Sequence, residues 1–258
     1  MPTLLQTVRA TLNRLLAPMD FRLERISEIT RLRHRYVDNP SIFAQALAGK
    51  RAPQVIDIGA SVGTTVAYTL AAAPDAEIYA FEPQPALSEA LHARFGANPH
   101  VHIFSMGVGS QSGTLPFTIA KTHSTSSFLP PSAYGRQALS KHVAPDLHLD
   151  VPVITLDSWY ESLVNPPAAF DLIKIDTQGY EAHVIQGGTN VLARSTYIIL
   201  EAAFRPLYEG QPVVGDICQM MRDRAFEIAF VRAGTANQTN GELWEVDILF
   251  KRTAAAKG

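Results

Sequence analysis

Residues 55–63 read Val55-Ile56-Asp57-Ile58-Gly59-Ala60-Ser61-Val62-Gly63, and this stretch decides the fold. A short apolar run typical of a buried strand leads into a Gly-x-x-x-Gly turn, and the residues after the turn have helical character. A second apolar run, Ile78–Phe81, is closed by Glu82 nineteen residues after Gly63. Strand, glycine turn, helix, strand and acid is the order of a βαβ unit in a parallel sheet.

The turn and the acid after it favour an adenosine-containing cofactor. Glycines at 59 and 63 would let the backbone approach a ligand, and the Glu82 carboxylate could accept hydrogen bonds from both ribose hydroxyls. Ser61 stands where the full Gly-x-Gly-x-x-Gly pattern has its middle glycine, and that pattern serves a pyrophosphate. S-adenosylmethionine has no pyrophosphate, so the departure favours it over NAD. A tight turn with a purely structural role is the alternative interpretation.

Composition and charge narrow the class of protein. The chain has 258 residues, of which 47% are hydrophobic and 18% charged, with a net charge of −2. Such a balance is typical of a globular protein and argues against nucleic acid as the main partner. The one cysteine permits no internal disulfide, which fits a reducing compartment, and we expect the cytoplasm. No apolar run reaches the roughly 18 residues that span a bilayer.

Residues 1–50 are predicted to form an N-terminal helical appendage, and residues 51–258 the main domain. Apolar residues recur at helical spacing over residues 1–17 and 20–37, and a shorter helix over Ser41–Ala48 is predicted to end at Gly49. Residues 1–50 have a local charge of +4, which leaves −6 for the rest. A solvated basic face is the plainer interpretation; peripheral contact with a membrane, docking of an acidic substrate, or a homodimer contact are the alternatives.

From Gln54 onward, strand-like and helix-like segments alternate, which predicts a parallel sheet with helices on both faces. The predicted strands are Val55–Ile58, Ile78–Phe81, Val101–Phe104, Val151–Ile154, Phe170–Ile175, Tyr197–Leu200, Phe226–Val231 and Trp244–Phe250, with an extra strand at Leu115–Ile119. The predicted helices are Val62–Ala72, Pro85–Phe95, Leu156–Leu163, Tyr180–Ile185, Thr189–Leu192 and Val213–Arg222. Lys121–Asp150 is polar and weakly periodic, so we expect an irregular insertion or lid on the substrate side.

A second cluster of polar residues follows the strand Phe170–Ile175, in the run Lys174-Ile175-Asp176-Thr177-Gln178-Gly179-Tyr180-Glu181. Asp176 could accept a proton from a substrate hydroxyl or hold the cofactor's ammonium group, and it could also cap the helix that begins near Tyr180. Lys174 within an apolar strand needs a carboxylate partner, such as Glu201 or Glu181. Glu201 is expected at the end of its strand and could share acid–base work with Asp176. Two acids make no convincing metal site, so no metal is predicted.

The insertion carries further candidates for proton transfer. A histidine there could act as a general base near neutral pH, although most loop histidines are merely solvated. His123 is the main candidate, and His183 is a lesser one outside the insertion. The other polar residues of the insertion are Ser124, Ser126, Ser127, Tyr134, Lys141, His142 and His148. P-loop, zincin and Cys-x-x-Cys motifs do not occur in the chain.

Together these motifs resemble the FkbM family of methyltransferases over roughly residues 54–202. The matching motifs are Asp57-Ile58-Gly59-Ala60-Ser61-Val62-Gly63, Phe81-Glu82-Pro83, Thr155-Leu156-Asp157, the run from Lys174 to Glu181, and Glu201. The resemblance implies a Rossmann-like class I methyltransferase fold, in which a seven-stranded, mostly parallel sheet has its last strand antiparallel. It also implies S-adenosylmethionine-dependent O-methylation of a hydroxyl on a sugar, glycan or polyketide-type small molecule.

The residues expected to act fall into two sets. Cofactor-binding residues would be Asp57, Gly59, Ala60, Ser61, Gly63, Glu82, Pro83, Ser105, Met106 and Asp176. Asp176, His123 and Glu201 are the candidates for catalysis. Two alternatives remain at this point: an NAD-dependent oxidoreductase of the same architecture, and a non-catalytic binding module.

Overall fold

The computed structural model describes residues 42–139, 145–234 and 241–253. Gln45–Gly258 is one compact unit. The helices predicted over residues 1–17 and 20–37 lie outside the described residues, as do Lys141, His142 and most of the polar turn predicted before the final strand. None of the helices in the described ranges has the length and apolar character needed to cross a membrane.

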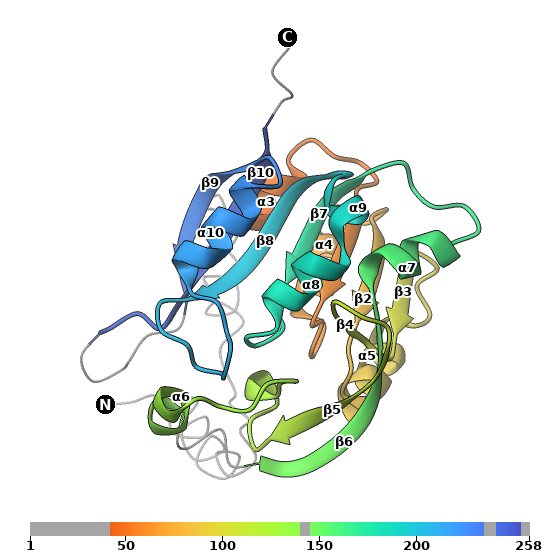
Figure 1. Ribbon diagram of the computed structural model, residues 1–258. Helices are drawn as coiled ribbons and strands as arrows, with labels where there is room; N and C mark the ends of the chain where they lie inside the picture. The colour runs from red at the N-terminus through yellow and green to blue at the C-terminus, as the bar shows by residue number, and fades with distance from the viewer. Residues whose placement is uncertain (1–41, 140–144, 235–240, 254–258) are drawn as a thin grey trace, which may run out of the picture. The chain divides into compact units, whose positions relative to one another are not determined.

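A seven-stranded sheet forms the centre of the main unit (Figure 1). In chain order its strands are β1 (Gln54–Ile58), β2 (Glu77–Phe81), β3 (Val101–Phe104), β7 (Phe170–Ile175), β8 (Ser195–Ala203), β9 (Phe226–Ala233) and β10 (Glu245–Arg252). Their spatial order is β3-β2-β1-β7-β8-β10-β9. The first five strands pair in parallel, and β10 is antiparallel to both of its neighbours. The Rossmann-like sheet with an antiparallel last strand is therefore confirmed.

Helices cover both faces of this sheet because the strand order reverses at β1. The chain moves from β1 to β2 on one side and later from β7 to β8 on the other, and right-handed crossovers then place their helices on opposite faces. One face carries α4 (Thr64–Ala72); the other carries α8 (Glu181–Gly187) and α9 (Thr189–Leu192) (Figure 1). The remaining helices are α3 (Ile42–Leu47), α5 (Pro85–Phe95), α6 (Ala133–Ala138), α7 (Leu156–Ser162) and α10 (Val214–Arg222).

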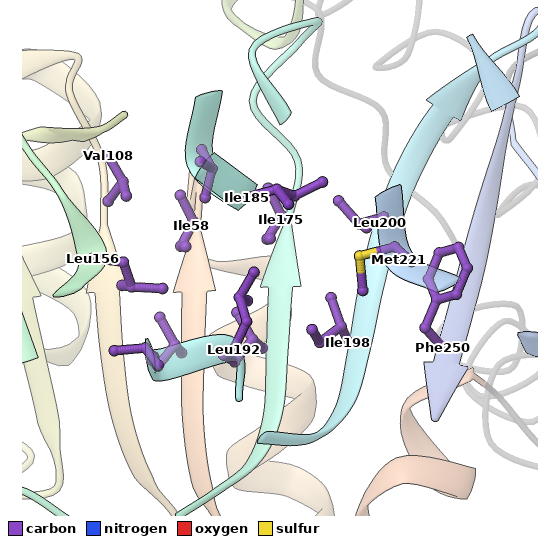
Figure 2. Packing of buried hydrophobic residues seen from close by; sticks show 14 of the residues in the cluster. Ile58, Val108, Leu156, Ile175, Ile185, Leu192, Ile198, Leu200, Met221 and Phe250 are labelled. Atoms are coloured by element: carbon purple, nitrogen blue, oxygen red, sulfur yellow. The ribbon is translucent and has the colours of Figure 1, made fainter. Parts of the chain in front are cut away.

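The main core lies between the sheet and helices α7 to α10 (Figure 2). Alternate residues of the central strands point to this face, among them Ile58, Ile175 and Leu200, and all three are buried. Helix residues that meet them include Ile185 and Met221. Because one face of each central strand is fixed by this packing, the residues between them, such as Asp57 and Lys174, face the other side of the sheet.

A three-stranded sheet borders the region predicted as an irregular insertion, Lys121–Asp150, and its last strand begins inside that region. Its strands are β4 (Gly107–Val108), β5 (Gly113–Ala120) and β6 (Pro145–Ile154), in the order β4-β6-β5. The prediction was wrong for the end of the insertion, because β6 begins at Pro145 rather than Val151. The first half of β6 pairs antiparallel with β5. Backbone hydrogen bonds to β5 therefore form the strand in this half, although side chains such as Leu147 and His148 are exposed. A short 3-10 helix (His123–Thr125) and α6 lie between β5 and β6.

Candidate active site

The predicted site residues gather at the carboxyl edge of the central strands, where the strand order reverses. Asp57 lies in β1 beside Lys174 of β7, and the register Asp57↔Lys174 makes them direct neighbours. Glu82 follows β2, and Asp176 follows β7. In open α/β sheets, this reversal point is where ligands bind.

The glycine turn is shaped first by close packing within the protein. Gly59 has φ +81, and a Cβ there would lie 1.9 Å from the backbone oxygen of Asp176. Gly63 has φ +79, and a Cβ there would lie 2.5 Å from the ring of Phe95. Ser61 adopts φ +50, which is unusual for a residue with a side chain and marks a backbone conformation held by its surroundings. The turn therefore needs both glycines even without a ligand, which agrees with the alternative interpretation that they have a structural role.

Glu82 holds the turn from the neighbouring strand. Its carboxylate accepts hydrogen bonds from the Ser61 N–H at 2.8 Å and from the Gln84 N–H at 2.9 Å. The side chain is buried, and burial raises the pKa of Glu82 to about 7, with the nearby charges of Asp57 and Asp176 acting in the same direction. Each carboxylate oxygen still has a lone pair to accept a further hydrogen bond, so a ribose contact stays compatible with this geometry.

Asp57 is a buried carboxylate that lacks a hydrogen-bond partner among the described residues. It is 0% exposed, and neither of its oxygens has a donor. The Lys174 ammonium lies 3.9 Å from Oδ1. Burial raises the pKa of Asp57 to about 6, and Lys174 offsets only part of this effect. Because buried polar groups are nearly always hydrogen-bonded, this carboxylate indicates a donor that a ligand or water would supply.

Lys174 pairs with different carboxylates from those predicted. Its ammonium group lies 2.9 Å from Asp176 and 3.9 Å from Asp57, and neither Glu201 nor Glu181 is its partner. The reason is the parallel register, which places Asp57 beside Lys174, together with the two-residue spacing that puts Asp176 on the same face of the strand.

Asp176 is held on both of its oxygens. Oδ2 accepts a hydrogen bond from Lys174, and Oδ1 accepts one from the side-chain amide of Gln178, both at 2.9 Å. Although burial raises it, the Lys174 charge and these hydrogen bonds hold the pKa of Asp176 below its usual range. The side chain is 31% exposed, so it remains open to a ligand.

The predicted capping role of Asp176 is wrong. No side chain of the described residues caps α8; the Oε1 of Glu181 instead accepts hydrogen bonds from the backbone N–H groups of Thr177 and Gly179. Those N–H groups lie in the turn just before α8, and the buried Glu181 reaches back to them from the first residue of the helix.

Glu201 lies within β8 and does not close it, contrary to the prediction. The strand continues to Ala203 because β10 pairs with it there. Glu201 nevertheless lies one residue beyond the last β7–β8 pair, Ile175↔Leu200, so it reaches the level of Asp176. Burial, together with the charge of Asp176, raises the pKa of Glu201 well above its usual range. The two acids therefore differ: the pKa of Asp176 is lowered and that of Glu201 is raised.

The remaining predicted residues lie around this centre. Ser105 follows β3, and its hydroxyl lies 2.5 Å from that of Ser88 on α5. Met106 packs partly against the main core, Pro83 directly follows Glu82, and Ala60 is buried in the turn. His183, the lesser candidate, is stacked on Tyr180 at 4.1 Å and contacts Ser110, and burial lowers its pKa.

His123 begins the 3-10 helix that ends at Thr125. The backbone oxygen of Thr125 accepts a hydrogen bond from the Tyr208 hydroxyl at 3.0 Å, and Tyr208 also contacts Gln178. The short helix is thus tied to the turn after β7. A catalytic role for His123 stays a prediction.

Two residues of the site escaped the sequence analysis, Gln178 and Tyr208. Gln178 donates to both Asp176 and Glu201, each at 2.9 Å. Tyr208 comes from the loop between β8 and α10, and no motif singles it out. Gln178 could have been noticed, because a polar residue next to Gly179 in a strand-to-helix turn faces the same edge as Asp176.

The arrangement can hold S-adenosylmethionine. Three buried or partly buried acids, Asp57, Asp176 and Glu201, face one described cation, Lys174, and the ligand carries an ammonium and a sulfonium charge that would reduce this imbalance. The unpartnered Asp57 carboxylate and the acceptor capacity of Glu82 fit donors of such a ligand. Over the part of the chain that the structure describes, no group of three or more His, Cys, Asp or Glu residues is placed to hold a metal.

Comparison with known proteins identifies the family. The profile described as "Methyltransferase FkbM domain" matches residues 57–228. The 2-O-methyltransferase NoeI of Sinorhizobium fredii is 28% identical over 64% of this chain and 70% of its own. The hexuronic acid methyltransferase AglP of Haloferax volcanii is 24% identical over 70% of this chain and 69% of its own. The methyltransferase sdnD of Sordaria araneosa is 23% identical over 70% of this chain and 76% of its own. With its sheet order and its motifs in place, this chain belongs to the FkbM family of S-adenosylmethionine-dependent methyltransferases.

Proposed function

We propose that this enzyme methylates a hydroxyl group of a sugar or a similar polyhydroxylated small molecule. The observation that carries the proposal is Asp176, an ionised, partly open carboxylate next to the cofactor residues. The names of two relatives agree with an oxygen acceptor on a carbohydrate, since one is a 2-O-methyltransferase and the other acts on a hexuronic acid. The cytoplasm is the compartment that we propose, because the chain has one cysteine.

The cofactor residues have distinct roles in this proposal. Glu82 binds the ribose hydroxyls, and Asp57 and Asp176 face the positively charged methionine end. The turn from Gly59 to Gly63 forms the floor, while Pro83, Ser105 and Met106 lie by the adenine. When bound, S-adenosylmethionine supplies a methyl group on a sulfonium centre. The work left to the protein is to position the acceptor hydroxyl and to receive its proton.

Asp176 is the group best placed to bind the acceptor hydroxyl. Its oxygens already accept from Lys174 and Gln178, and each has a lone pair left for a hydroxyl donor. A lowered pKa makes Asp176 a weak base but a reliable hydrogen-bond acceptor, so it orients the hydroxyl throughout the neutral pH range. Burial and the charge of Asp176 raise the pKa of Glu201, which makes it the less readily ionised of the two acids.

Calorimetry with S-adenosylhomocysteine tests the cofactor placement. Glu82→Ala should weaken binding at least tenfold, about 1.4 kcal/mol, because it removes the ribose acceptor and releases the Ser61 N–H. Glu82→Gln keeps a carbonyl acceptor for one N–H, so its affinity should lie between those of the unaltered protein and Glu82→Ala. Glu89→Ala removes an exposed acid from α5 and should bind like the unaltered protein. Equal affinity in Glu82→Ala and Glu89→Ala would refute the placement.

The acceptor is tested with labelled S-adenosylmethionine and a panel of neutral hexoses, hexuronic acids and amino sugars. The expected product carries the label as an ether at a ring hydroxyl, which mass spectrometry with fragmentation locates. Asp176→Asn should lower the turnover number at least tenfold while leaving S-adenosylhomocysteine bound. Transfer to nitrogen or to the carboxyl group in place of a hydroxyl would overturn the proposal.

A further inference from the structure

The amide of Gln178 bridges two carboxyl groups that come from different strands. Its Nε2 donates to Oδ1 of Asp176, which follows β7, and to Oε2 of Glu201 in β8, each at 2.9 Å. An amide nitrogen has two hydrogens, so both donations occur at once. The two acids also interact with each other, since a hydrogen bond from Glu201 contributes to lowering the pKa of Asp176.

Gln178 itself is held by three other segments. Its backbone has φ +53, and the next residue, Gly179, has φ +94. A Cβ at position 179 would lie 2.8 Å from the ring of Tyr208, so Gly179 packs directly against that ring. The Ser127 hydroxyl, from the insertion, donates to the Gln178 backbone oxygen at 2.7 Å. An uncommon backbone conformation that several contacts fix is typical of residues that serve function.

Tyr208 limits the orientation of the amide. Its hydroxyl donates to the Thr125 backbone oxygen at 3.0 Å and lies 3.3 Å from Oε1 of Gln178, so its single hydrogen serves one of these acceptors at a time. Burial, and then the surrounding acids, raise the pKa of Tyr208, so the phenol stays protonated and acts as a donor. With Oε1 facing this donor, Nε2 faces the two carboxyl groups.

Several charged groups determine how Asp176 and Glu201 titrate. Asp176 faces Lys174, Asp57 of β1, Glu82 and Glu181, in addition to Glu201. Glu201 also faces Glu245 and Asp247 of β10, and Asp247 is paired with Arg232 of β9. Lys174 of β7 and Arg232 of β9 are the cations paired with these acids, and Gln178 is a neutral donor to two of them.

We propose that Gln178 is a positioning residue: its donation to Oδ1 stabilises the ionised form of Asp176 and ties this carboxylate to Glu201 of the neighbouring strand. Tyr208 supports it by limiting the orientation of the amide. The catalytic meaning of this arrangement rests on the proposed function, because Asp176 is the group that binds the acceptor hydroxyl there. The effect on the Asp176 carboxylate does not depend on that function.

Carbon-13 resonances of labelled Asp and Glu carboxyl groups, assigned with Asp176→Asn and Glu201→Gln, measure the proposal directly. In Gln178→Leu the midpoint of Asp176 should rise by about one pH unit, a tenfold gain in proton affinity, because a donor to its charged form is lost. Tyr208→Phe should raise it by less, since the amide remains but is no longer oriented. Gln186→Leu, an exposed glutamine on α8, is the matched control and should leave the midpoint unchanged.

A second substitution separates positioning from damage to the fold. In Gln178→Leu with Glu201→Gln, the new amide at 201 can donate to Asp176, so the midpoint should move back down. Thermal unfolding of each variant tests whether it is folded. If Gln178→Leu does not fold, the Asp176 midpoint in Tyr208→Phe tests the proposal in its place. An Asp176 midpoint that is the same in the unaltered protein and in every folded variant would overturn the inference. Calorimetry with S-adenosylhomocysteine on the same samples tests the proposed function separately. If the protein does not bind this ligand, the proposed function fails, but the carboxyl titrations can still be measured and interpreted.

Discussion

Gly59 lies in the site turn, and the turn can pack against Asp176 only because residue 59 has no side chain. Gly59→Ala should lower the free energy of unfolding by more than about 3 kcal/mol, because the new Cβ would meet the Asp176 backbone oxygen at φ +81. Gly49→Ala is the matched control: φ is +73, nothing lies within 4 Å, and about 1 kcal/mol is expected from the conformation alone. Denaturant unfolding compares the two. Equal losses would mean that the contact with Asp176 has no energetic weight.

At the residue scale, the sequence predicts which groups matter better than how they pair. Lys174 is the one cation in its strand, and Asp57 begins the glycine-turn motif, so two different signals placed them in the site. Their pairing depends on the register Asp57↔Lys174, which only the packed sheet sets. Gln178 was missed because its effect depends on an uncommon backbone conformation and on Tyr208, thirty residues away.

At the scale of elements, α9 depends on an acid from another helix. Asp157 of α7 accepts hydrogen bonds from the N–H groups of Asn190 and Val191, at 2.9 to 3.0 Å, at the start of α9. Asp157→Ala should therefore lower stability by about 1 kcal/mol, as loss of an N-terminal cap does. Glu161→Ala removes the same charge from an exposed position of α7 and should change stability by less than half of that. The melting temperatures of the two variants give the comparison, and the reverse order would contradict this role.

Thr155 caps α7, since its side chain accepts a hydrogen bond from the Ser158 N–H. The strands Phe170–Ile175 and Val101–Phe104 were predicted to the residue, and in the first of them the four apolar residues are all buried. β6 and β8 were not. β6 begins among exposed polar residues, and β8 continues past Glu201 only because β10 lies beside it. The residues of β6 and β8 do not themselves indicate that β5 and β10 pair with them.

For the whole molecule, the buried acids predict an unusual dependence of stability on pH. Burial raises the pKa values of Glu82 and Glu181 to about 7 from 4.5, so between pH 4.5 and 7 the folded state binds more protons than the unfolded state. Stability gained from these groups is thus fully present near pH 4.5 and is lost as pH rises through 7, by up to about 3 kcal/mol for each group. Asp57, with a pKa raised to about 6, acts in the same direction.

Thermal unfolding between pH 5 and 8 measures this effect. The melting temperature should fall over that range, and the fall should be smaller in Glu181→Gln, which keeps an acceptor for Thr177 and Gly179 but cannot ionise. A melting temperature that rises steadily to pH 8 would show that the acids are ionised at no cost in the folded protein. Saturating S-adenosylmethionine should flatten the dependence, because its positive charges favour the ionised carboxylates.

The position of β10 also has a consequence for the order of assembly. β10 lies between β8 and β9 in space but follows both in the chain, so β9 reaches its place in the sheet only once β10 is available to pair with it. During synthesis, the parallel strands up to β8 can pair in turn as they leave the ribosome. β9 must wait, with its backbone donors and acceptors facing water or a chaperone. The row of acids that includes Glu201 is therefore completed last, when Asp247 and Glu245 arrive, and the site matures only after the scaffold beneath it has formed.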